Sequence, residues 1–333
     1  MTRAVALFSG GLDSILACRL MASLGVEVTA VKFVTPLFDY HLLSQPDYPD
    51  QIRSKYGINV RLGDLSHDYL ELLRAPAHGF GRHFNPCLDC KILMLRRARE
   101  MMPELGAEFL ISGEVVGQRP MSQRRDTLRV VERDSGCDDL LLRPLSAQHL
   151  KPTKPEREGL VDRDRLLGFA GRGRAGQMAL AVELGIGDYP SPAGGCALTD
   201  PIIGERVKRF YREREAVRVA DLRLLTVGRH LVMPGGAWLV MGRRQEENQV
   251  VTALVEPGDV RLRLADRPGP SGLVRYLRHP EDLSWAAGVV ARYGKKGEDG
   301  RPAPGRVECQ DETGVRLLAG VPPPEEWLRD WLR

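Results

Sequence analysis

The chain has 333 residues, of which 43% are hydrophobic and 28% charged, with a formal net charge of +4. This length favours two domains, and the composition is that of a water-soluble enzyme. No apolar run approaches the length of about 18 residues that a membrane-spanning helix needs, and the mild charge does not by itself indicate a polyanionic partner. Six cysteines without a regular framework indicate a reducing compartment, so we expect a cytoplasmic protein that does not contact membranes.

The first half of the chain alternates short apolar runs with helix-like stretches, which is typical of a parallel β-sheet wrapped by helices. Strands are expected at residues 5–8, 26–33, 58–62, 108–112 and 140–145, and helices at residues 12–24, 91–101 and 177–184. Residues 151–176, rich in Pro, Arg and Gly, indicate a basic loop with one short helix, and residues 189–196 a rigid turn. These patterns predict an α/β fold with helices on both faces of the sheet.

The second half of the chain shows strands around tight turns. A hairpin is expected from residues 225–233 and 237–242, a second strand pair around residues 267–270, a helix at 281–292, further strand at 306–318 and a short helix at 325–333. The last helix would carry Trp327, Leu328, Trp331 and Leu332 on one side. We therefore predict a catalytic domain at residues 1–205 and a smaller, β-rich α+β domain at residues 206–333.

The first strand runs directly into a glycine-rich loop and then a helix. Such a turn places backbone N–H groups and the positive end of the helix dipole where a phosphate can bind. Two glycines allow close approach of a ligand, two serine hydroxyls can donate to phosphate oxygens, and the aspartate could hold Mg²⁺ or simply suit the helix dipole. The loop consists of Ser9, Gly10, Gly11, Leu12, Asp13 and Ser14. It is not a Walker A loop, because no Gly-Lys-Ser/Thr follows.

Two cysteines three residues apart, Cys87 and Cys90, precede a predicted helix. We expect the helix dipole to lower the pKa of these thiols. Cys196 lies in the Gly/Pro turn and could reach the same cleft, so the three cysteines could ligate a metal or a [4Fe–4S] cluster with one open position. A structural zinc half-site or an incidental pair remains the alternative. Cys18 is expected in the core, and Cys137 and Cys309 have no assigned role.

A second polar motif, residues 111–123, follows the fourth strand, at the edge where open α/β sheets bind ligands. Gly113 and Gly117 would let the backbone approach a nucleotide, and Glu114, Gln118 and Ser122 would offer polar contacts. An ordinary helix N-terminus is the alternative. We assign Gly113 and Gln118 to the nucleotide site, together with Lys32 and Phe33 at the end of the second strand.

The loop Ser-Gly-Gly-Leu-Asp-Ser resembles the PP-loop of the ATP pyrophosphatases, which cleave ATP between the α- and β-phosphates and adenylate a substrate. This resemblance implies a PP-loop (adenine nucleotide alpha hydrolase-like) fold that uses ATP and Mg²⁺, with Asp13 as a catalytic residue. The second motif, followed by Leu142-Arg143-Pro144-Leu145, is similar to the catalytic domain of tRNA 4-thiouridine synthase (the ThiI family).

Asn85-Pro86-Cys87-Leu88-Asp89-Cys90 is similar to the Asn-Pro-x-x-x-Cys segment of tRNA 2-thiouridylase (the MnmA family). By this resemblance Cys90 matches the catalytic cysteine, and Cys196 matches the later cysteine of both families. The extra Cys87 resembles the thiolation enzymes that bind an iron–sulfur cluster through three cysteines. No THUMP domain is recognisable before the loop and no rhodanese domain after it, so we do not expect the usual sulfur delivery of 4-thiouridine synthase. The lysine expected after Arg-Pro-Leu is out of register, at Lys151.

Elements of the second half, Val227-Gly228-Arg229, Glu247-Asn248 and Gly269-Pro270, resemble the RNA-binding domain of the NFACT proteins. Arginines near strand ends suit phosphate contacts that position RNA without reading its sequence, although solvated surface charge is the alternative. The candidate RNA contacts are Arg172, Arg174, Arg229 and Arg243.

Together these features indicate an ATP-dependent tRNA sulfurtransferase that adenylates a uridine carbonyl oxygen and replaces it with sulfur. The partners would be tRNA and a sulfur donor, either derived from a cysteine desulfurase or inorganic sulfide. Two alternatives stay open: a PP-loop enzyme that adenylates a small molecule, and an RNA-binding factor with a vestigial ATP site.

Overall fold

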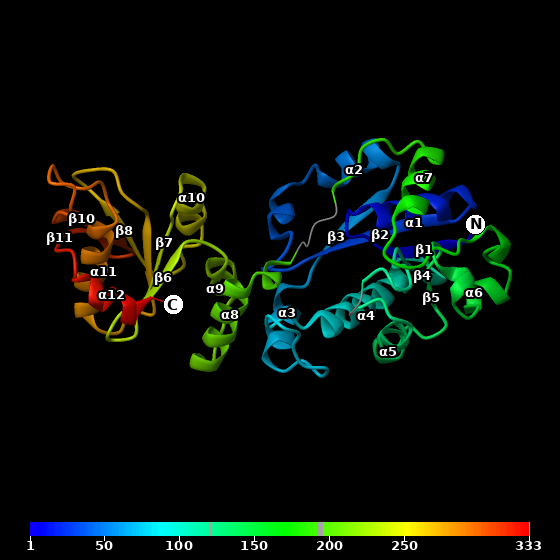
Figure 1. Ribbon diagram of the computed structural model, residues 1–333, viewed down its shortest axis with the longest axis horizontal. Helices are drawn as coiled ribbons and strands as arrows, with labels where there is room; N and C mark the ends of the chain where they lie inside the picture. The colour runs from blue at the N-terminus through cyan, green and yellow to red at the C-terminus, as the bar shows by residue number, and fades with distance from the viewer. Residues whose placement is uncertain (120–121, 192–195, 333) are drawn as a thin grey trace. The chain divides into compact units, whose positions relative to one another are not determined.

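The computed structural model describes residues 1–119, 122–191 and 196–332. Pro120 and Met121 of the second motif and residues 192–195 of the predicted turn lie outside the described residues. The chain divides into two compact units, Met1–Pro201 and Ile202–Arg333 (Figure 1). In the described residues no helix combines the length and the apolarity that crossing a membrane requires.

Unit 1 is built on a five-stranded sheet in the order β3-β2-β1-β4-β5, in which every neighbouring pair is parallel. The strands are β1 (Arg3–Leu7), β2 (Glu27–Val34), β3 (Asn59–Asp64), β4 (Phe109–Ser112) and β5 (Leu141–Leu142). The predicted α/β class is therefore confirmed. The fifth strand is shorter than expected, because Arg143 leaves the sheet to join a buried cluster of charges.

Helices cover both faces of this sheet (Figure 1). They are α1 (Leu12–Ser23), α2 (Tyr48–Tyr56), α3 (Ser66–Arg74), α4 (Cys87–Leu105), α5 (Arg125–Ser135), α6 (Lys154–Arg157) and α7 (Ala175–Glu183), with 3₁₀ turns η1 (Tyr40–Ser44), η2 (Ala147–His149), η3 (Arg163–Arg165) and η4 (Ala197–Thr199). Alternation along β1 sets the two cores. Ala4 and Ala6 face the α1 and α7 side, whereas Val5 and Leu7 face α4 and α5.

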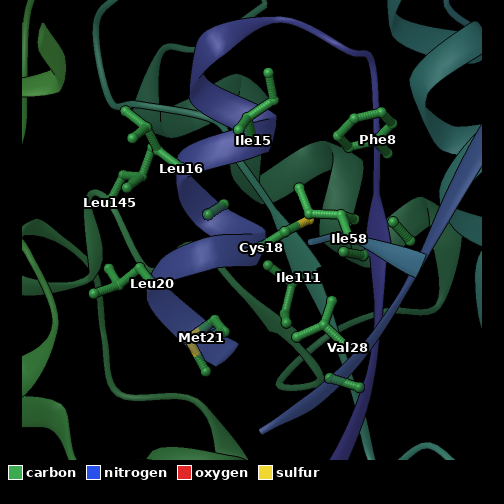
Figure 2. Packing of buried hydrophobic residues seen from close by; sticks show 14 of the residues in the cluster. Phe8, Ile15, Leu16, Cys18, Leu20, Met21, Val28, Ile58, Ile111 and Leu145 are labelled. Atoms are coloured by element: carbon green, nitrogen blue, oxygen red, sulfur yellow. The ribbon is translucent and has the colours of Figure 1, made fainter. Parts of the chain in front are cut away.

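Helix α1 is fastened to the sheet by an almost wholly buried apolar surface (Figure 2). Cys18 points toward Ile58 and Ile111, which confirms its expected place in the core. Burial raises the pKa of the Cys18 thiol to about 12, so this cysteine stays neutral. The first turn of α1 is thereby fixed at the carboxyl edge of the sheet.

Unit 2 contains a six-stranded antiparallel sheet in the order β11-β10-β8-β9-β7-β6. Its strands are β6 (Arg229–Val232), β7 (Trp238–Met241), β8 (Val260–Leu264), β9 (Gly272–Arg275), β10 (Gly305–Asp311) and β11 (Gly314–Gly320), and its helices are α8 (Pro201–Glu213), α9 (Val219–Leu225), α10 (Gln245–Ala253), α11 (Pro280–Arg292) and α12 (Glu325–Trp331). Both predicted hairpins and the predicted β-rich α+β character are confirmed.

Three details of the second half differ from the sequence prediction. Leu225 ends a helix instead of starting a strand. Residues 306–318 form two strands, because Thr313 donates to the Asp311 carboxylate and Gly314 takes φ +135°, which together make a tight turn. In α12 only Leu328 is fully buried, whereas Trp327 is 40% exposed and contacts Trp285 edge-on.

A fully buried arginine, Arg275, organises unit 2. Its guanidinium donates to Asp221 at 2.8 Å and to Asp259 at 2.6 Å, and all three side chains are at most 2% exposed. The Leu254 carbonyl accepts a further hydrogen bond from Arg275 at 2.7 Å. Removing Arg275 would leave Asp259 buried without a counter-charge and Asp221 with only Arg218, whose Nε lies 3.7 Å away.

We expect Arg275→Ala to lower the free energy of unfolding of unit 2 by about 3–5 kcal/mol, because it leaves the buried Asp259 unpaired and Asp221 with only the more distant Arg218. All four tryptophans of the chain lie in unit 2, so denaturant unfolding followed by tryptophan fluorescence reports this unit within the whole chain. Arg263→Ala is the matched control, since the Arg263 side chain is exposed and its surface ion pair with Glu308, in the same sheet, contributes little to stability. Equal losses in the two variants would contradict the assignment.

Candidate active site

The glycine-rich loop forms a closed turn between β1 and α1. Gly11 caps the helix and Gly10 has φ +82°, a conformation that favours glycine. Ser14 Oγ donates to the Gly11 carbonyl at 2.8 Å, and Ser9 Oγ lies 3.2 Å from Ser14 Oγ. The loop is therefore set by its own side chains, and the first-turn N–H groups of α1 face the carboxyl edge of the sheet.

Lys32 supports this loop from β2. Its Nζ donates to the Ser9 carbonyl at 2.6 Å and lies 2.5 Å from the Asp39 carboxylate, in a side chain only 7% exposed. The neighbouring Phe33 points its ring into the core on the α4 side. Of the two residues assigned to the nucleotide site, Lys32 thus lies at the loop, whereas Phe33 could contact a nucleotide only through its backbone.

Asp13 is held at the first turn of α1 by two side chains. Gln118 donates to Asp13 Oδ2 at 2.8 Å and is itself contacted by Gln177 at 3.3 Å. Arg174 Nη2 lies 3.8 Å from Asp13 Oδ1, which is buried and has no hydrogen-bond partner among the residues that the structure describes. The expected RNA contact Arg174 therefore lies beside the nucleotide loop, while Arg172 is exposed.

Gly113 has a different use from the expected one. A Cβ at this position would lie 2.5 Å from the Asp13 carbonyl oxygen, so the missing side chain lets the end of β4 touch the first turn of α1. Gly117 has φ +77°, and its N–H donates to the Gln123 carbonyl at 2.7 Å. Because the next helix, α5, begins only at Arg125, the alternative of a helix N-terminus directly after β4 is wrong.

Glu114 is buried rather than open to a ligand, in contrast to our expectation. Its carboxylate accepts from Ser112 Oγ at 2.9 Å and from Arg143 Nε at 3.1 Å, and lies 3.5 Å from Lys91 Nζ. Burial alone would raise the pKa of Glu114, but Lys91, Arg143 and Ser112 outweigh burial and lower it to about 2. An ionised Glu114 thus joins the segment after β4 to Lys91, the neighbour of Cys90 in α4.

The three candidate cysteines lie around one tyrosine. Cys87 is the first residue of α4, Cys90 is one turn further, and Cys196 precedes η4. The Tyr69 hydroxyl of α3 lies close enough to the Cys90 and Cys196 thiols to lower the pKa of each. Ala197 N donates to the Leu37 carbonyl at 2.9 Å, which fastens the Cys196 segment to the loop after β2. The structure therefore brings Cys196 to the other two cysteines, over a sequence separation that no local pattern bridges.

The expected lowering of the thiol pKa is wrong for Cys90. The pKa of Cys90 is raised to about 12, mainly by burial, with the thiols of Cys196 and Cys87 contributing to the rise and Lys91 opposing it. Burial likewise raises the pKa of Cys196. For Cys90, desolvation therefore outweighs the helix dipole. Within the described residues, no three Cys, His, Asp or Glu side chains are placed to hold a single metal ion.

A histidine that sequence reasoning missed anchors the cysteine turn. His78 Nδ1 lies 2.9 Å from the Asp89 carboxylate, and its Nε2 lies 2.9 Å from Asp134 at the end of α5. Asp89 stands between Cys87 and Cys90, and its hydrogen bond is the main reason that the pKa of His78 is raised. No motif spacing connects these three positions, so only the fold reveals the contact.

In unit 2 the elements shared with the NFACT proteins converge. Arg243 Nη2 donates to the Gly228 carbonyl at 2.6 Å, and the Asn248 side chain accepts from Ser271 N at 3.0 Å. Arg229 lies over the Tyr293 ring at 4.7 Å. Both arginines thus have structural contacts, and Arg243 is also exposed.

Comparison with known proteins agrees with both resemblances. Residues 1–150 match the family model "Thiamine biosynthesis protein (ThiI)", and residues 228–332 match "NFACT protein RNA binding domain". A curated relative, the "Probable tRNA sulfurtransferase" of Thermococcus kodakarensis, is 29% identical over 144 residues, which are 43% of this chain and 36% of the relative. The chain thus spans about a third of the length of that relative. The resemblances to ThiI and to the NFACT RNA-binding domain are confirmed.

Two solved structures are also similar. The crystal structure of a 4-thiouridine synthetase–RNA complex with bound ATP is 22% identical, with a TM-score of 0.37, over 68% of this chain and 52% of that chain. The C-terminal part of the fibronectin/fibrinogen-binding protein of Streptococcus suis is 14% identical, with a TM-score of 0.28, over 74% of this chain and 90% of that chain.

The burial of the thiols predicts an order of reactivity in metal-free, reduced protein. At pH 8 iodoacetamide should label the exposed Cys87 first, and the Cys90 rate should rise about tenfold per pH unit up to pH 10 without a plateau, because only the thiolate reacts. Peptide mass spectrometry measures each site, with buried Cys18 as the unreactive control. A Cys90 rate that levels off near pH 7 would contradict the raised pKa.

Proposed function

We propose that this chain is an ATP-dependent tRNA sulfurtransferase that adenylates a uridine carbonyl oxygen and replaces it with sulfur. The match of residues 1–150 to the ThiI model and the likeness to the T. kodakarensis sulfurtransferase support the substrate class. The observation that carries the proposal is the position of Glu114. Glu114 directly follows Gly113, which touches the nucleotide loop. The Glu114 carboxylate is paired with Lys91, the neighbour of Cys90. Nucleotide loop and thiols thus belong to one site.

The loop before α1 suits the phosphates of ATP. Its first-turn N–H groups, the Ser9 hydroxyl and the Arg174 guanidinium supply the hydrogen bonds and the positive charge that phosphate oxygens need. Asp13 Oδ1 is a buried carboxylate oxygen that accepts no hydrogen bond from the described part of the chain, which fits a divalent cation that arrives with the nucleotide. In the proposal Asp13 therefore holds Mg²⁺ while Gln118 fixes its second oxygen.

The reaction follows from these parts. The uridine carbonyl oxygen attacks the α-phosphate, pyrophosphate leaves, and the oxygen becomes part of an AMP leaving group. The terminal sulfur of a persulfide on Cys90, which Cys90 receives as sulfane sulfur from a persulfide donor that is left as a thiol, then attacks the activated carbon, and AMP departs with the oxygen. Cys196 attacks Cys90 Sγ, which leaves the transferred sulfur on the uridine and joins the two cysteines in a disulfide. A thiol reductant restores them.

The cysteines also fit an iron–sulfur cluster. They are not placed around one ion, but a cluster binds each thiolate at a different iron, and its positive charge would offset the cost of ionising buried thiols. Cys87, Cys90 and Cys196 would hold the cluster, which when bound would supply an iron with an open position for sulfur.

Unit 2 would hold the RNA. Its match to the NFACT RNA-binding domain supports this role, and the exposed Arg243 can reach phosphates while its other contact holds the Gly228 turn. Arg172 of unit 1, exposed in the basic loop, and Arg229 are the other arginines proposed to contact the tRNA backbone.

The function is tested by nucleoside analysis. Purified full-length protein, given unmodified tRNA, ATP, Mg²⁺ and a sulfide or persulfide donor, should form one thiolated nucleoside, detected by mass spectrometry. Asp13→Asn should reduce its formation at least about 100-fold, because the cation loses its carboxylate. Asp188→Asn is the control, since Asp188 is exposed and contacts only Lys55 among the described charges. The proposal would be overturned if no thiolated nucleoside formed and the protein instead released pyrophosphate from ATP when given a metabolite without RNA.

The cluster is tested separately. Anaerobically purified protein should contain iron and absorb light at about 400 nm, as [4Fe–4S] proteins do. The Cys87→Ser variant should lose both the iron and this absorbance. The buried Cys137→Ser serves as the control, because Cys137 lies in the core away from the cysteine turn. Iron-free protein with full thiolation activity would remove the cluster from the proposal and leave the persulfide route.

A further inference from the structure

Two phenylalanine rings are stacked in the loop that leads into the cysteine helix. The centroids of Phe80 and Phe84 are 3.8 Å apart and the ring planes differ by only 15°. Phe80 is 40% exposed, whereas Phe84 is half-buried. Phe84 covers one face of the Phe80 ring, so the exposed area of Phe80 lies on its opposite face and its edge.

The loop holds this stack in a costly conformation. Phe84 has φ +62°, a left-handed conformation that bulky side chains rarely adopt. Asn85 imposes it, because its side chain accepts from His83 N at 3.1 Å and its carbonyl accepts from Gly81 N at 2.9 Å. Phe80, at 40% exposure, gains little burial in return for this strain, so a use of its ring outside the folding of this loop is the better account.

Both ends of the loop are fastened to the cysteine turn. The Asn85 side-chain amide lies 3.0 Å from Cys87 Sγ. At the other end the His78 backbone N–H donates to Asp89 at 3.1 Å, and the His78 ring bridges Asp89 and Asp134. These contacts fix the position of the stacked rings relative to the thiols.

The charge of the loop suits a nucleic acid. Residues 75–88 include Arg82, His78 and His83 and contain neither Asp nor Glu. Arg82 is exposed, two residues from each ring. An aromatic face beside a cation is the combination with which proteins bind unstacked bases of RNA.

We propose that the Phe80–Phe84 stack is a platform for an unstacked base of the RNA substrate, with Arg82 on an adjacent phosphate. This inference rests on the proposed function in that the base is presented to the sulfur-bearing cysteines. It adds a binding site that belongs to neither the nucleotide loop nor the arginines of unit 2. Stacking tolerates any base, so the platform supplies affinity and position and leaves sequence choice to other contacts.

Full-length variants at Phe80 test the platform, and the exposure of this residue makes them compatible with folding. Phe80→Leu keeps the apolar volume and removes the aromatic face, Phe80→Tyr keeps the face, and Val182→Ala, at an 81% exposed site on α7, is the control. The probe is a short single-stranded RNA containing 2-aminopurine, whose fluorescence is quenched by stacking. Wild type, Phe80→Tyr and Val182→Ala should quench it alike, whereas Phe80→Leu should lose the quenching and bind about tenfold more weakly.

Thiolation kinetics on tRNA separate this inference from the proposed function. Phe80→Leu should raise KM for tRNA about tenfold, with kcat within about twofold. If wild type thiolates tRNA but Phe80→Leu matches it in quenching and in KM, the platform is wrong and the function stands. If no variant thiolates tRNA while quenching still depends on the Phe80 ring, the platform stands and the function fails. A Phe80→Leu defect seen only with a protein sulfur donor, and absent with sulfide, would overturn the platform in favour of donor docking.

Discussion

The interaction on which the site depends is the buried ion cluster at Glu114. Its carboxylate is shared by Ser112, Arg143 and Lys91, so a single charge fixes the segment after β4, the segment after β5 and the first turn of α4. Gly113, the residue before Glu114, touches the backbone of the nucleotide loop. Displacement of the Glu114 carboxylate would therefore change the positions of both the nucleotide loop and the thiols. Buried ion pairs add little net stability but tolerate few alternative arrangements, which suits an element that must keep two reacting groups in register.

The electrostatics of the cysteines give the proposed reaction its order. Burial keeps Cys90 and Cys196 neutral, so they are poor nucleophiles until something compensates the desolvation. Lys91 is the nearest compensating charge, and Glu114 partly neutralises it. An incoming persulfide or a cluster would change this balance, as would the RNA that we propose to rest on the Phe80–Phe84 stack. Thiol chemistry would then depend on the substrate being in place.

The sequence was informative where a function depends on adjacent residues. The strand, the glycine pair and Asp13 are contiguous, so the loop between β1 and α1 could be predicted, as could the parallel sheet and both hairpins of unit 2. It failed where the decisive quantity is burial or long-range contact. The raised pKa of Cys90, the burial of Glu114, the place of Arg174 beside Asp13 and the His78–Asp89–Asp134 bridge arise only after distant segments have packed together. Phe80 and Phe84 carry no motif, and their pairing depends on a backbone angle that the residue types disfavour.

The central claim is that one site activates a uridine oxygen with ATP and then replaces it with sulfur. Transfer of label from ATP carrying ³²P at the α-phosphate tests it most directly. With unmodified tRNA and the Cys90→Ser variant, the account predicts that label accumulates on the RNA, because adenylation proceeds and sulfur transfer does not, while wild type releases the label as AMP. Formation of ADP in place of AMP, or RNA that never carries the α-phosphate in either protein, would contradict it.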